Sequence, residues 1–367
     1  MFAAHADVVG SLLRPRELVQ ARERWERGEI GPPEFKRIED AAVEAAIRLQ
    51  ENAGLAVVTD GEMRRLSFQS QLIEAVEGFS DWDLDAFLWG DWHGDDVGDK
   101  HIPRPPIAVL GRLRRRRFLC AEEFTYARGC TERVVKVTLP SPSLFANFYD
   151  PERSRGCYPS LESFLGEVAE ILREEVDELV RLGCEYVQLD APHYLLLLDA
   201  AYRDFYASRG WPAERWLELG LELDNVVIGT RPGVTFGFHL CRGNQQSRWL
   251  VEGSYNWLAQ RLFPCVRAQR LLLEYDDERS GGFAPLAAVP QDTIVVLGLV
   301  TTKTRRCETV DELETRIRQA ARHVPLERLA LSAQCGFATS ILGNALSADD
   351  QETKLRTIVA TAERVWG

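Results

Sequence analysis

The sequence lacks any long hydrophobic run. Hydrophobic residues make up 45% of its 367 positions, but no stretch approaches the roughly 20 consecutive apolar residues that a membrane-spanning helix needs. The opening residues, MFAAHADVVGSLLRPREL, contain no basic region followed by a long apolar stretch, as a secretion signal would. We therefore expect a soluble, cytoplasmic globular protein that buries a large core and has no membrane partner.

The sequence also lacks an excess of positive charge. It has 44 Lys and Arg residues against 56 Asp and Glu residues, a net charge of -12. Such a balance argues against a nucleic-acid partner, because binding to phosphates needs clustered positive charge. The one basic run, RLRRRR at 112–117, favours a solvated hairpin or loop, with binding of a polyanionic tail as the alternative.

Regular cysteine spacing, internal repeats and linkers are missing as well. The eight cysteines follow no repeated spacing, and in a chain without a secretion signal they are expected to be reduced thiols. We therefore expect a single domain over residues 1–367.

Short runs rich in β-branched residues alternate with amphipathic helical patterns along the whole chain. The eight strand candidates span 7–11, 55–62, 133–140, 185–192, 233–240, 271–277, 293–300 and 329–335. The clearest helical patterns span 33–54, 160–183, 308–324 and 349–367. Continuous apolar strand centres indicate burial on both faces, so the pattern predicts an α/β fold of the (β/α)8 TIM-barrel type. The long connection at 63–132 predicts an inserted helix and hairpin after strand two, with the basic run at the hairpin turn.

Metal-competent side chains follow several of the predicted strands. His239 and Cys241 leave the fifth strand on the same face, Glu274 belongs to the sixth and Cys335 ends the eighth. Chemistry in these barrels gathers at the C-terminal ends of the strands, and zinc takes such nitrogen, sulfur and carboxylate ligands. Spacing alone leaves two interpretations open: a four-ligand zinc site, or unrelated packed and ion-paired residues.

Six segments carry a resemblance to a known family. They are VVGSLLRP, VVTDGEMRR, GFHLCRGN, LLLEYDDERSGGFAPL, VVLGLVTTKTRRCETVDELETRI and LALSAQCGFATS. In this order, from about residue 7 to the end of the chain, they resemble the cobalamin-independent methionine synthases, and in particular a short, single-barrel branch similar to their catalytic domain. The resemblance implies a barrel in which Zn2+ activates a thiol, such as homocysteine, to accept a methyl group and give methionine.

The resemblance also implies roles for individual residues. The implied metal ligands are His239, Cys241, Glu274 and Cys335. Residues implied to hold the amino-acid part of the thiol are Val9, Gly10, Ser11, Glu62 and Asp190, in which two carboxylates face an ammonium and backbone amides face a carboxylate. Lys303 and Asp190 are the candidate catalytic residues.

Three departures from the family pattern leave the methyl donor open. The segment KVTLPSPSLF has no tryptophan to stack on a pterin, Lys303 lies where relatives have a proton-donating histidine, and Ala191 replaces an acid. The expected partners are a small-molecule thiol and a methyl donor, either a methylated folate or a corrinoid carrier. The apolar C-terminal helix and the barrel faces would permit a homodimer.

Two other enzyme classes remain as alternatives. A zinc-dependent alkyltransferase of the epoxide–thiol type would use the same ligands, with Lys303 neutralising an alkoxide or an anionic tail. A metal-free lyase similar to uroporphyrinogen decarboxylase would use arginines as carboxylate clamps, and the candidates are Arg14, Arg16, Arg64 and Arg65. The lyase would leave the histidine, cysteine and glutamate set unexplained. A homologue that has lost the activity is a third reading, against which the four retained ligand residues count.

Overall fold

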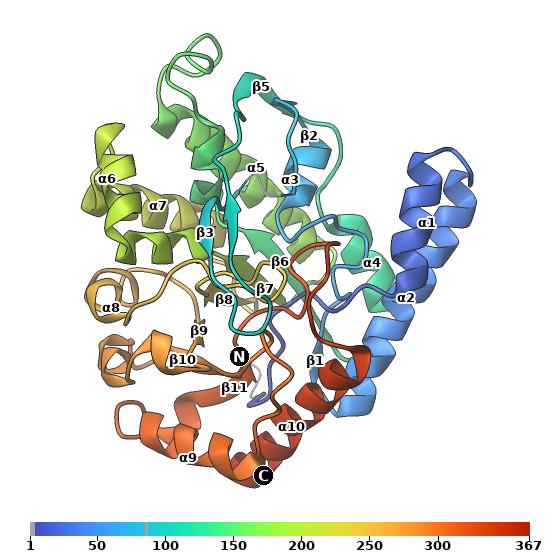
Figure 1. The fold of residues 1–367 in the computed structure, drawn as a ribbon, viewed down its shortest axis with the longest axis vertical. Coiled ribbons are helices and arrows are strands. Elements are labelled where there is room, and N and C mark those ends of the chain that lie inside the picture. The colour runs from blue at the N-terminus through green and yellow to red at the C-terminus, as the bar shows by residue number, and fades with distance from the viewer. Residues whose placement is uncertain (1–3, 85–86) are drawn as a thin grey trace.

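A curled, seven-stranded parallel sheet forms the centre of the molecule in the computed structural model, which describes residues 4–84 and 87–367 (Figure 1). The strands, each hydrogen-bonded to the next, are β1 (Val57–Val58), β6 (Val134–Pro140), β7 (Tyr186–Asp190), β8 (Thr235–Leu240), β9 (Arg270–Glu274), β10 (Ile294–Val300) and β11 (Leu329–Ala333). Their spatial order follows the chain, so all seven carry their C-terminal ends at one edge of the sheet.

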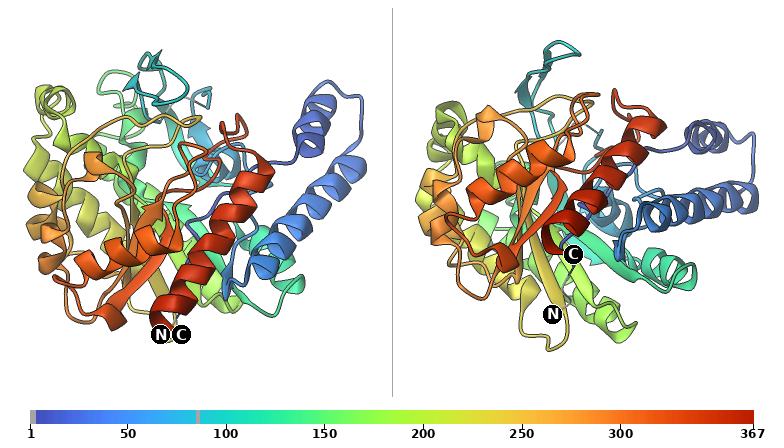
Figure 2. Two further views of the ribbon diagram at one scale, coloured as in Figure 1. Left: turned by 60° about the horizontal axis from the view of Figure 1, so that its bottom comes forward. Right: turned by 90° about the horizontal axis from the view of Figure 1, so that it is seen from below.

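Most of the helices pack around the outside of this sheet, and the first projects away from it beside the second (Figure 2). The helices are α1 (Arg16–Glu26), α2 (Pro32–Ala53), α3 (Ser70–Ala75), α4 (Ala121–Gly129), α5 (Leu161–Arg181), α6 (Ala200–Ser208), α7 (Ala213–Ile228), α8 (Asn256–Leu262), α9 (Val310–Ala320) and α10 (Ala348–Trp366). Short 3-10 turns span Pro142–Phe148, Pro192–Leu198, Glu278–Ser280, Ala284–Ala288 and Leu326–Arg328.

The four predicted helices are confirmed to within a few residues, and local chemistry explains their ends. Helix α5 is capped at its N-terminus by Ser160, whose side chain accepts a hydrogen bond from the backbone of Ser163 in a reciprocal capping box. Helix α2 is capped at its C-terminus by Gly54, which has a φ of 94° and supplies the left-handed residue that closes many helices.

The predicted first strand, 7–11, is wrong as a strand, although its residues lie where an eighth strand would. Ala6 forms an isolated parallel bridge with Leu331 of β11, and the Leu12 amide donates to the Gly61 carbonyl beyond β1 at 3.0 Å. This segment therefore lies between the two edge strands of the sheet. It does not become a regular strand because the Val8 amide donates to the Asp7 carboxylate at 2.8 Å. That amide is therefore not available for hydrogen bonding to a neighbouring strand.

The long connection after β1 holds helices and two antiparallel pairs. Strand β2 (Val76–Phe79) pairs with β5 (Val109–Arg115), and β3 (Gly90–Trp92) pairs with β4 (Lys100–Ile102). The expected turn at the basic run 112–117 is wrong, because most of that run lies in β5.

The arginines of the basic run are paired with acidic residues. Arg114 and Arg116 both donate to the Glu77 carboxylate, and Arg112 donates to Glu167 at 3.0 Å. Each of these arginines thus already has an acidic partner within the chain, which leaves the run with little free charge for a polyanionic tail.

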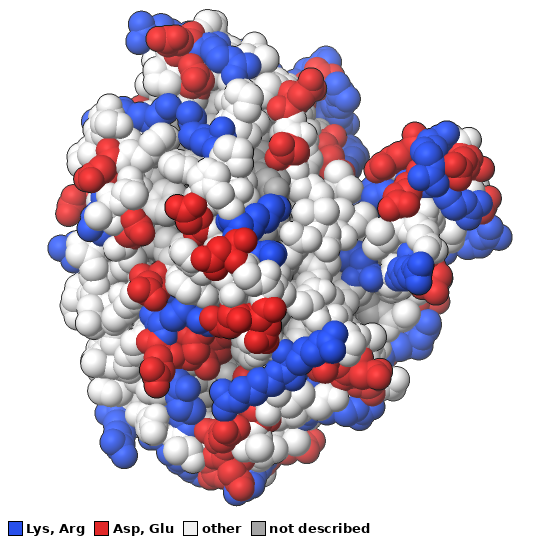
Figure 3. All heavy atoms as spheres, viewed as in Figure 1, with Lys and Arg blue, Asp and Glu red and all other residues white. Residues whose placement is uncertain are grey.

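Charges of both signs are interspersed on the outer surface. Figure 3 shows Lys and Arg next to Asp and Glu across one face of the molecule. Among the helices in the described part of the chain, none is long and apolar enough to cross a bilayer.

Candidate metal and substrate site

A pocket of about 60 Å³ lies at the edge of the sheet where the parallel strands end. Its lining combines polar and metal-competent residues with apolar and aromatic ones. The lining residues are Val9, Gly10, Ser11, Glu62, Phe68, Gln69, Leu84, Phe87, Leu88, Trp92, Asp190, Pro192, His239, Cys241, Gly243, Asn244, Gln245, Cys335, Gly336 and Thr339. The predicted thiol-binding residues and three of the four predicted metal ligands therefore share one cavity.

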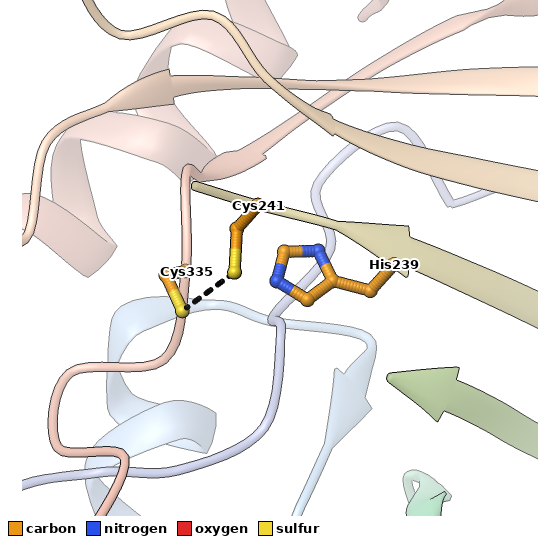
Figure 4. Close-up of side chains that lie close together, drawn as sticks. All are labelled: His239, Cys241 and Cys335. Carbon is orange, nitrogen blue, oxygen red and sulfur yellow. Dashed lines mark hydrogen bonds between the residues drawn. The ribbon is translucent and has the colours of Figure 1, made fainter. Parts of the chain in front are cut away.

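His239, Cys241 and Cys335 point toward one another (Figure 4), and all three line the pocket. Their ligand atoms lie within 4.8 Å of one another, and all three side chains are buried. His239 belongs to β8, Cys241 follows directly after it, and Cys335 follows β11. One nitrogen and two sulfur donors at this spacing could hold a metal ion such as zinc.

The histidine is oriented for coordination. Its Nδ1 lies 3.3 Å from the Leu272 carbonyl oxygen, while its Nε2 is buried without a hydrogen-bond partner among the described residues. A carbonyl on one ring nitrogen and an unpaired second nitrogen are the usual arrangement of a metal-binding histidine. The unpaired Nε2 of His239 is thus evidence for a metal ion at this position, independent of any likeness to other proteins.

The two thiols polarise each other. The Cys335 thiol donates to the Cys241 sulfur over 3.7 Å, and this bond, together with His239, lowers the pKa of Cys241 well below the ordinary thiol value in spite of burial. The same bond raises the pKa of Cys335. Because metals bind the thiolate form, Cys241 is already prepared to act as a ligand.

Glu274, the fourth predicted ligand, lies next to the three-residue cluster but is not part of it. Its Oε1 accepts a hydrogen bond from Lys303 Nζ at 2.8 Å, and its Oε2 accepts one from the Arg242 amide at 2.6 Å. Burial alone would raise the pKa of Glu274, but the Lys303 ammonium and Arg242 lower it below its usual range. The carboxylate is thus kept ionised close to the cluster.

Lys303 lies outside the pocket lining. Its side chain is 1% exposed and its ammonium also lies 3.7 Å from Asp276. Burial opposes its charge, but the carboxylates of Asp276 and Glu274 raise its pKa. The structure places Lys303 as an ion-pair partner of Glu274, at a position where it does not face the cavity.

Glu62 and Asp190 supply the acidic wall of the pocket. Glu62 follows Gly61, and both adopt positive φ values, of 57° and 69°, a conformation that costs a non-glycine residue energy and is common at functional sites. Oε1 of Glu62 accepts a hydrogen bond from Thr138 at 2.8 Å, while its buried Oε2 accepts none from the described residues. Burial raises the pKa of Asp190 to about 7.

The backbone of residues 9–11 lies next to the Glu62 carboxylate. A Cβ added to Gly10 would come within 2.9 Å of Glu62 Oε1, so only glycine lets the two approach. In the same way a Cβ on Gly336 would collide with the Ser11 hydroxyl. Gly10 and Gly336 both line the pocket, so side chains there approach the backbone closely.

The arginines of the lyase alternative do not line this pocket. Arg14 donates to the Glu62 carbonyl at 2.8 Å, Arg65 to Glu123 at 3.0 Å, and Arg64 to Asp40. These arginines are used in structural hydrogen bonds and ion pairs, which leaves no carboxylate clamp in the described part of the pocket.

Sequence reasoning missed the aromatic residues of the pocket lining. Phe68, Phe87 and Trp92 come from the long connection after β1 and line the cavity, and nothing in their spacing indicates a site. The position of Asn244 in the pocket was easier to predict from the sequence, because Asn244 lies three residues after Cys241, just beyond the C-terminal end of a parallel strand.

The chain resembles known proteins over nearly its whole length. A family model described as "Cobalamin-independent synthase, Catalytic domain" matches residues 5–363. The chain is 31% identical over 364 residues to the uncharacterized protein YxjH of Bacillus subtilis (strain 168), covering 98% of this chain and 94% of that protein. It is 27% identical over 333 residues to the methionine synthase of Pyrococcus abyssi (strain GE5 / Orsay), covering 90% and 85%. A solved Listeria monocytogenes structure, described as a candidate vitamin-B12 independent methionine synthase, matches with a TM-score of 0.75 and 26% identity, covering 100% of both chains.

Proposed function

Because the chain belongs to the family of the cobalamin-independent synthase catalytic domain, we propose that it is a zinc-dependent methyltransferase that moves a methyl group from a small donor to a thiol. The acceptor is homocysteine or a closely similar aminothiol, and the product from homocysteine is methionine. The observation that carries this proposal is the buried cluster of His239, Cys241 and Cys335, which opens into the same pocket as Glu62 and Asp190.

In this proposal His239, Cys241 and Cys335 hold zinc, with Glu274 as the fourth, exchangeable ligand. When bound, zinc supplies a Lewis acid that keeps a substrate thiol in its nucleophilic thiolate form at neutral pH. Lys303 and the Arg242 amide position the Glu274 carboxylate. Lys303 is therefore proposed as a positioning residue.

The acidic wall explains the choice of an aminothiol. Glu62 Oε2 is buried and accepts no hydrogen bond from the described residues, and Asp190 lies in the same cavity. A substrate ammonium would supply the missing donor, and a charge-assisted bond of this kind is stronger than one between neutral groups. The backbone amides of Val9, Gly10 and Ser11 are the proposed contacts for the substrate carboxylate.

A transfer assay tests this function. Zinc-loaded protein is incubated with homocysteine and, separately, with methyltetrahydrofolate, methylcobalamin or the generic methylating agent iodomethane. We expect enzyme-dependent methionine formation with at least one donor, and its loss in Cys335→Ser. No acceleration with any donor, iodomethane included, would contradict thiol activation.

A further inference from the structure

The aromatic part of the pocket lining indicates what kind of molecule delivers the methyl group. We propose that the donor is a small methylated cation, a sulfonium or quaternary ammonium compound, bound against the aromatic wall formed by Phe68, Phe87 and Trp92. This inference rests on the proposed methyl transfer to a thiol and adds the chemical class of the second substrate.

The charge of the cavity favours a cation. Among the described lining residues there is no Lys or Arg, whereas Glu62 and Asp190 are both acidic. Arg14 and Arg65 pair with the Glu62 carboxylate from behind the lining, at 4.0 and 3.7 Å, so Asp190 carries most of the argument for a cation. An anionic donor, such as a folate with its glutamate tail or a sulfonated thiol, would meet no counterion inside the pocket. A cation would be attracted, because a cavity with low-dielectric walls strengthens the field of its carboxylates.

The aromatic wall offers a second attraction for positive charge. Trp92 is 3% exposed and Phe87 is 2% exposed, so both rings are already largely shielded from water. A cation over an aromatic face gains roughly 0.5 to 2 kcal/mol, and desolvation increases this gain.

The Trp92 ring packs directly on the metal-binding segment. A Cβ on Gly243 would lie 2.6 Å from Trp92 Cζ3 and 2.8 Å from Cη2, so the ring touches the backbone two residues after Cys241. The wall that would hold the donor therefore stands beside the cluster that would hold the acceptor.

Two side-chain carbonyls add negative character at the same place. Asn244 Nδ2 donates to Thr302 Oγ1 at 2.8 Å and to the Gly336 carbonyl at 3.1 Å, which fixes the orientation of its amide. Asn244 Oδ1 and Gln69 Oε1 are then buried acceptors without a donor among the described residues. Unpaired buried acceptors are costly unless a ligand satisfies them electrostatically.

The transfer from a cation also needs no acid from the protein. The acceptor thiol first loses its proton to solvent; the sulfur electron pair then forms the new S–C bond. The bond from the methyl carbon to the onium sulfur or nitrogen breaks, and its electron pair stays on the leaving atom, which departs as a neutral sulfide or amine. A tertiary amine donor would instead require protonation, and Lys303, in the place of the family's proton donor, is held by Glu274 outside the cavity.

The decisive experiment compares donors on zinc-loaded protein with homocysteine. We expect trimethylsulfonium to yield methionine faster than methyltetrahydrofolate or methylcobalamin at equal concentration. Two results would contradict the proposed donor class: acceleration with iodomethane but not with trimethylsulfonium, or a faster reaction with methyltetrahydrofolate or methylcobalamin. Neither result would contradict the activation of the thiol. Failure with iodomethane as well would contradict the proposed function itself, and the donor inference with it.

Variants and binding test the aromatic wall separately. Trp92→Leu should lower kcat/KM for trimethylsulfonium relative to iodomethane by about tenfold, whereas Trp89→Leu, a tryptophan of the same connection that does not line the pocket, should not change this ratio. By calorimetry, choline should bind more tightly than its uncharged isostere 3,3-dimethylbutan-1-ol. An unchanged ratio in Trp92→Leu, or equal binding of the two isosteres, would refute the aromatic cation site.

Discussion

At the scale of single residues, the buried pair of Lys303 and Glu274 governs the surroundings of the cluster. Both side chains are almost fully buried, and Asp276 lies nearby. Two carboxylates so close together repel each other unless a cation compensates them. Lys303 supplies that charge, and this role explains why a lysine can stand here without facing the cavity.

Replacing Lys303 should therefore destabilise the folded protein strongly. Lys303→Met keeps the length of the side chain but leaves the buried carboxylates uncompensated, and we expect the free energy of unfolding to fall by roughly 3 to 5 kcal/mol. Urea denaturation measures this change. Lys36→Met is the control, because Lys36 is half exposed and its surface pairs are worth at most about 1 kcal/mol. Equal losses in the two variants would refute the compensating role.

Glu62 should govern affinity for the aminothiol. Glu62→Gln removes the negative charge with little change in size, and we expect KM for homocysteine to rise about ten- to hundredfold, because a hydrogen bond to a charged group is worth roughly 1.5 to 3 kcal/mol. Steady-state kinetics measures the effect, with Glu26→Gln on the exposed side of α1 as control. An unchanged KM would show that the ammonium is bound elsewhere.

The sequence supported the residue-level predictions unevenly. The His239 and Cys241 pair was predictable because alternation along a strand puts both side chains on one face. The hydrogen bond from Lys303 to Glu274 was not, because it joins two strand ends 29 residues apart in the chain. Trp92 could not be assigned to the pocket without knowing how the β3 and β4 hairpin folds back.

At the scale of elements, helix α7 is tied to the turn after β7 by a buried hydrogen bond. The Tyr194 hydroxyl donates to Asp224 at 2.6 Å, while the second oxygen of Asp224 has no partner among the described residues. Burial raises the pKa of Asp224 from 3.8 to about 7. The folded protein therefore binds this proton more tightly than the unfolded chain does.

This shift predicts a pH-dependent stability. Because the folded-state pKa is the higher one, the stabilisation is complete below about pH 4 and is lost as the pH rises to about 7. Relative to Asp224→Asn, which keeps the oxygen that accepts from Tyr194, the wild type should lose on the order of 4 kcal/mol between pH 4 and 8. Chemical denaturation across this range measures the difference, and parallel pH profiles for the two proteins would contradict it.

Element prediction succeeded where periodicity was strong. The helices α2, α5, α9 and α10 were predicted from apolar spacing and their caps. The segment 7–11 has strand-like composition, but the Asp7 side chain takes the Val8 amide. Local side-chain competition of this kind is not visible in hydrophobic pattern alone.

At the scale of the whole molecule, the sheet brings distant parts of the chain to one rim. Residues near the N-terminus, Cys241 in the middle and Cys335 near the C-terminus line one cavity, and the long connection after β1 covers it. The barrel pattern made the convergence of the strand ends predictable. The cover was not predictable, because its short strands pair across an irregular stretch of sequence.

Metal content is the most direct test of the central claim, that His239, Cys241 and Cys335 form a thiol-activating zinc site. Zinc is measured by mass spectrometry in the purified wild type, in Cys335→Ser and in Cys265→Ser, which changes an exposed cysteine far from the cluster in the chain. We predict near-stoichiometric zinc in the wild type and in Cys265→Ser, and a large loss in Cys335→Ser. A wild type that purifies without zinc and does not take it up, or equal zinc in all three proteins, would contradict the account.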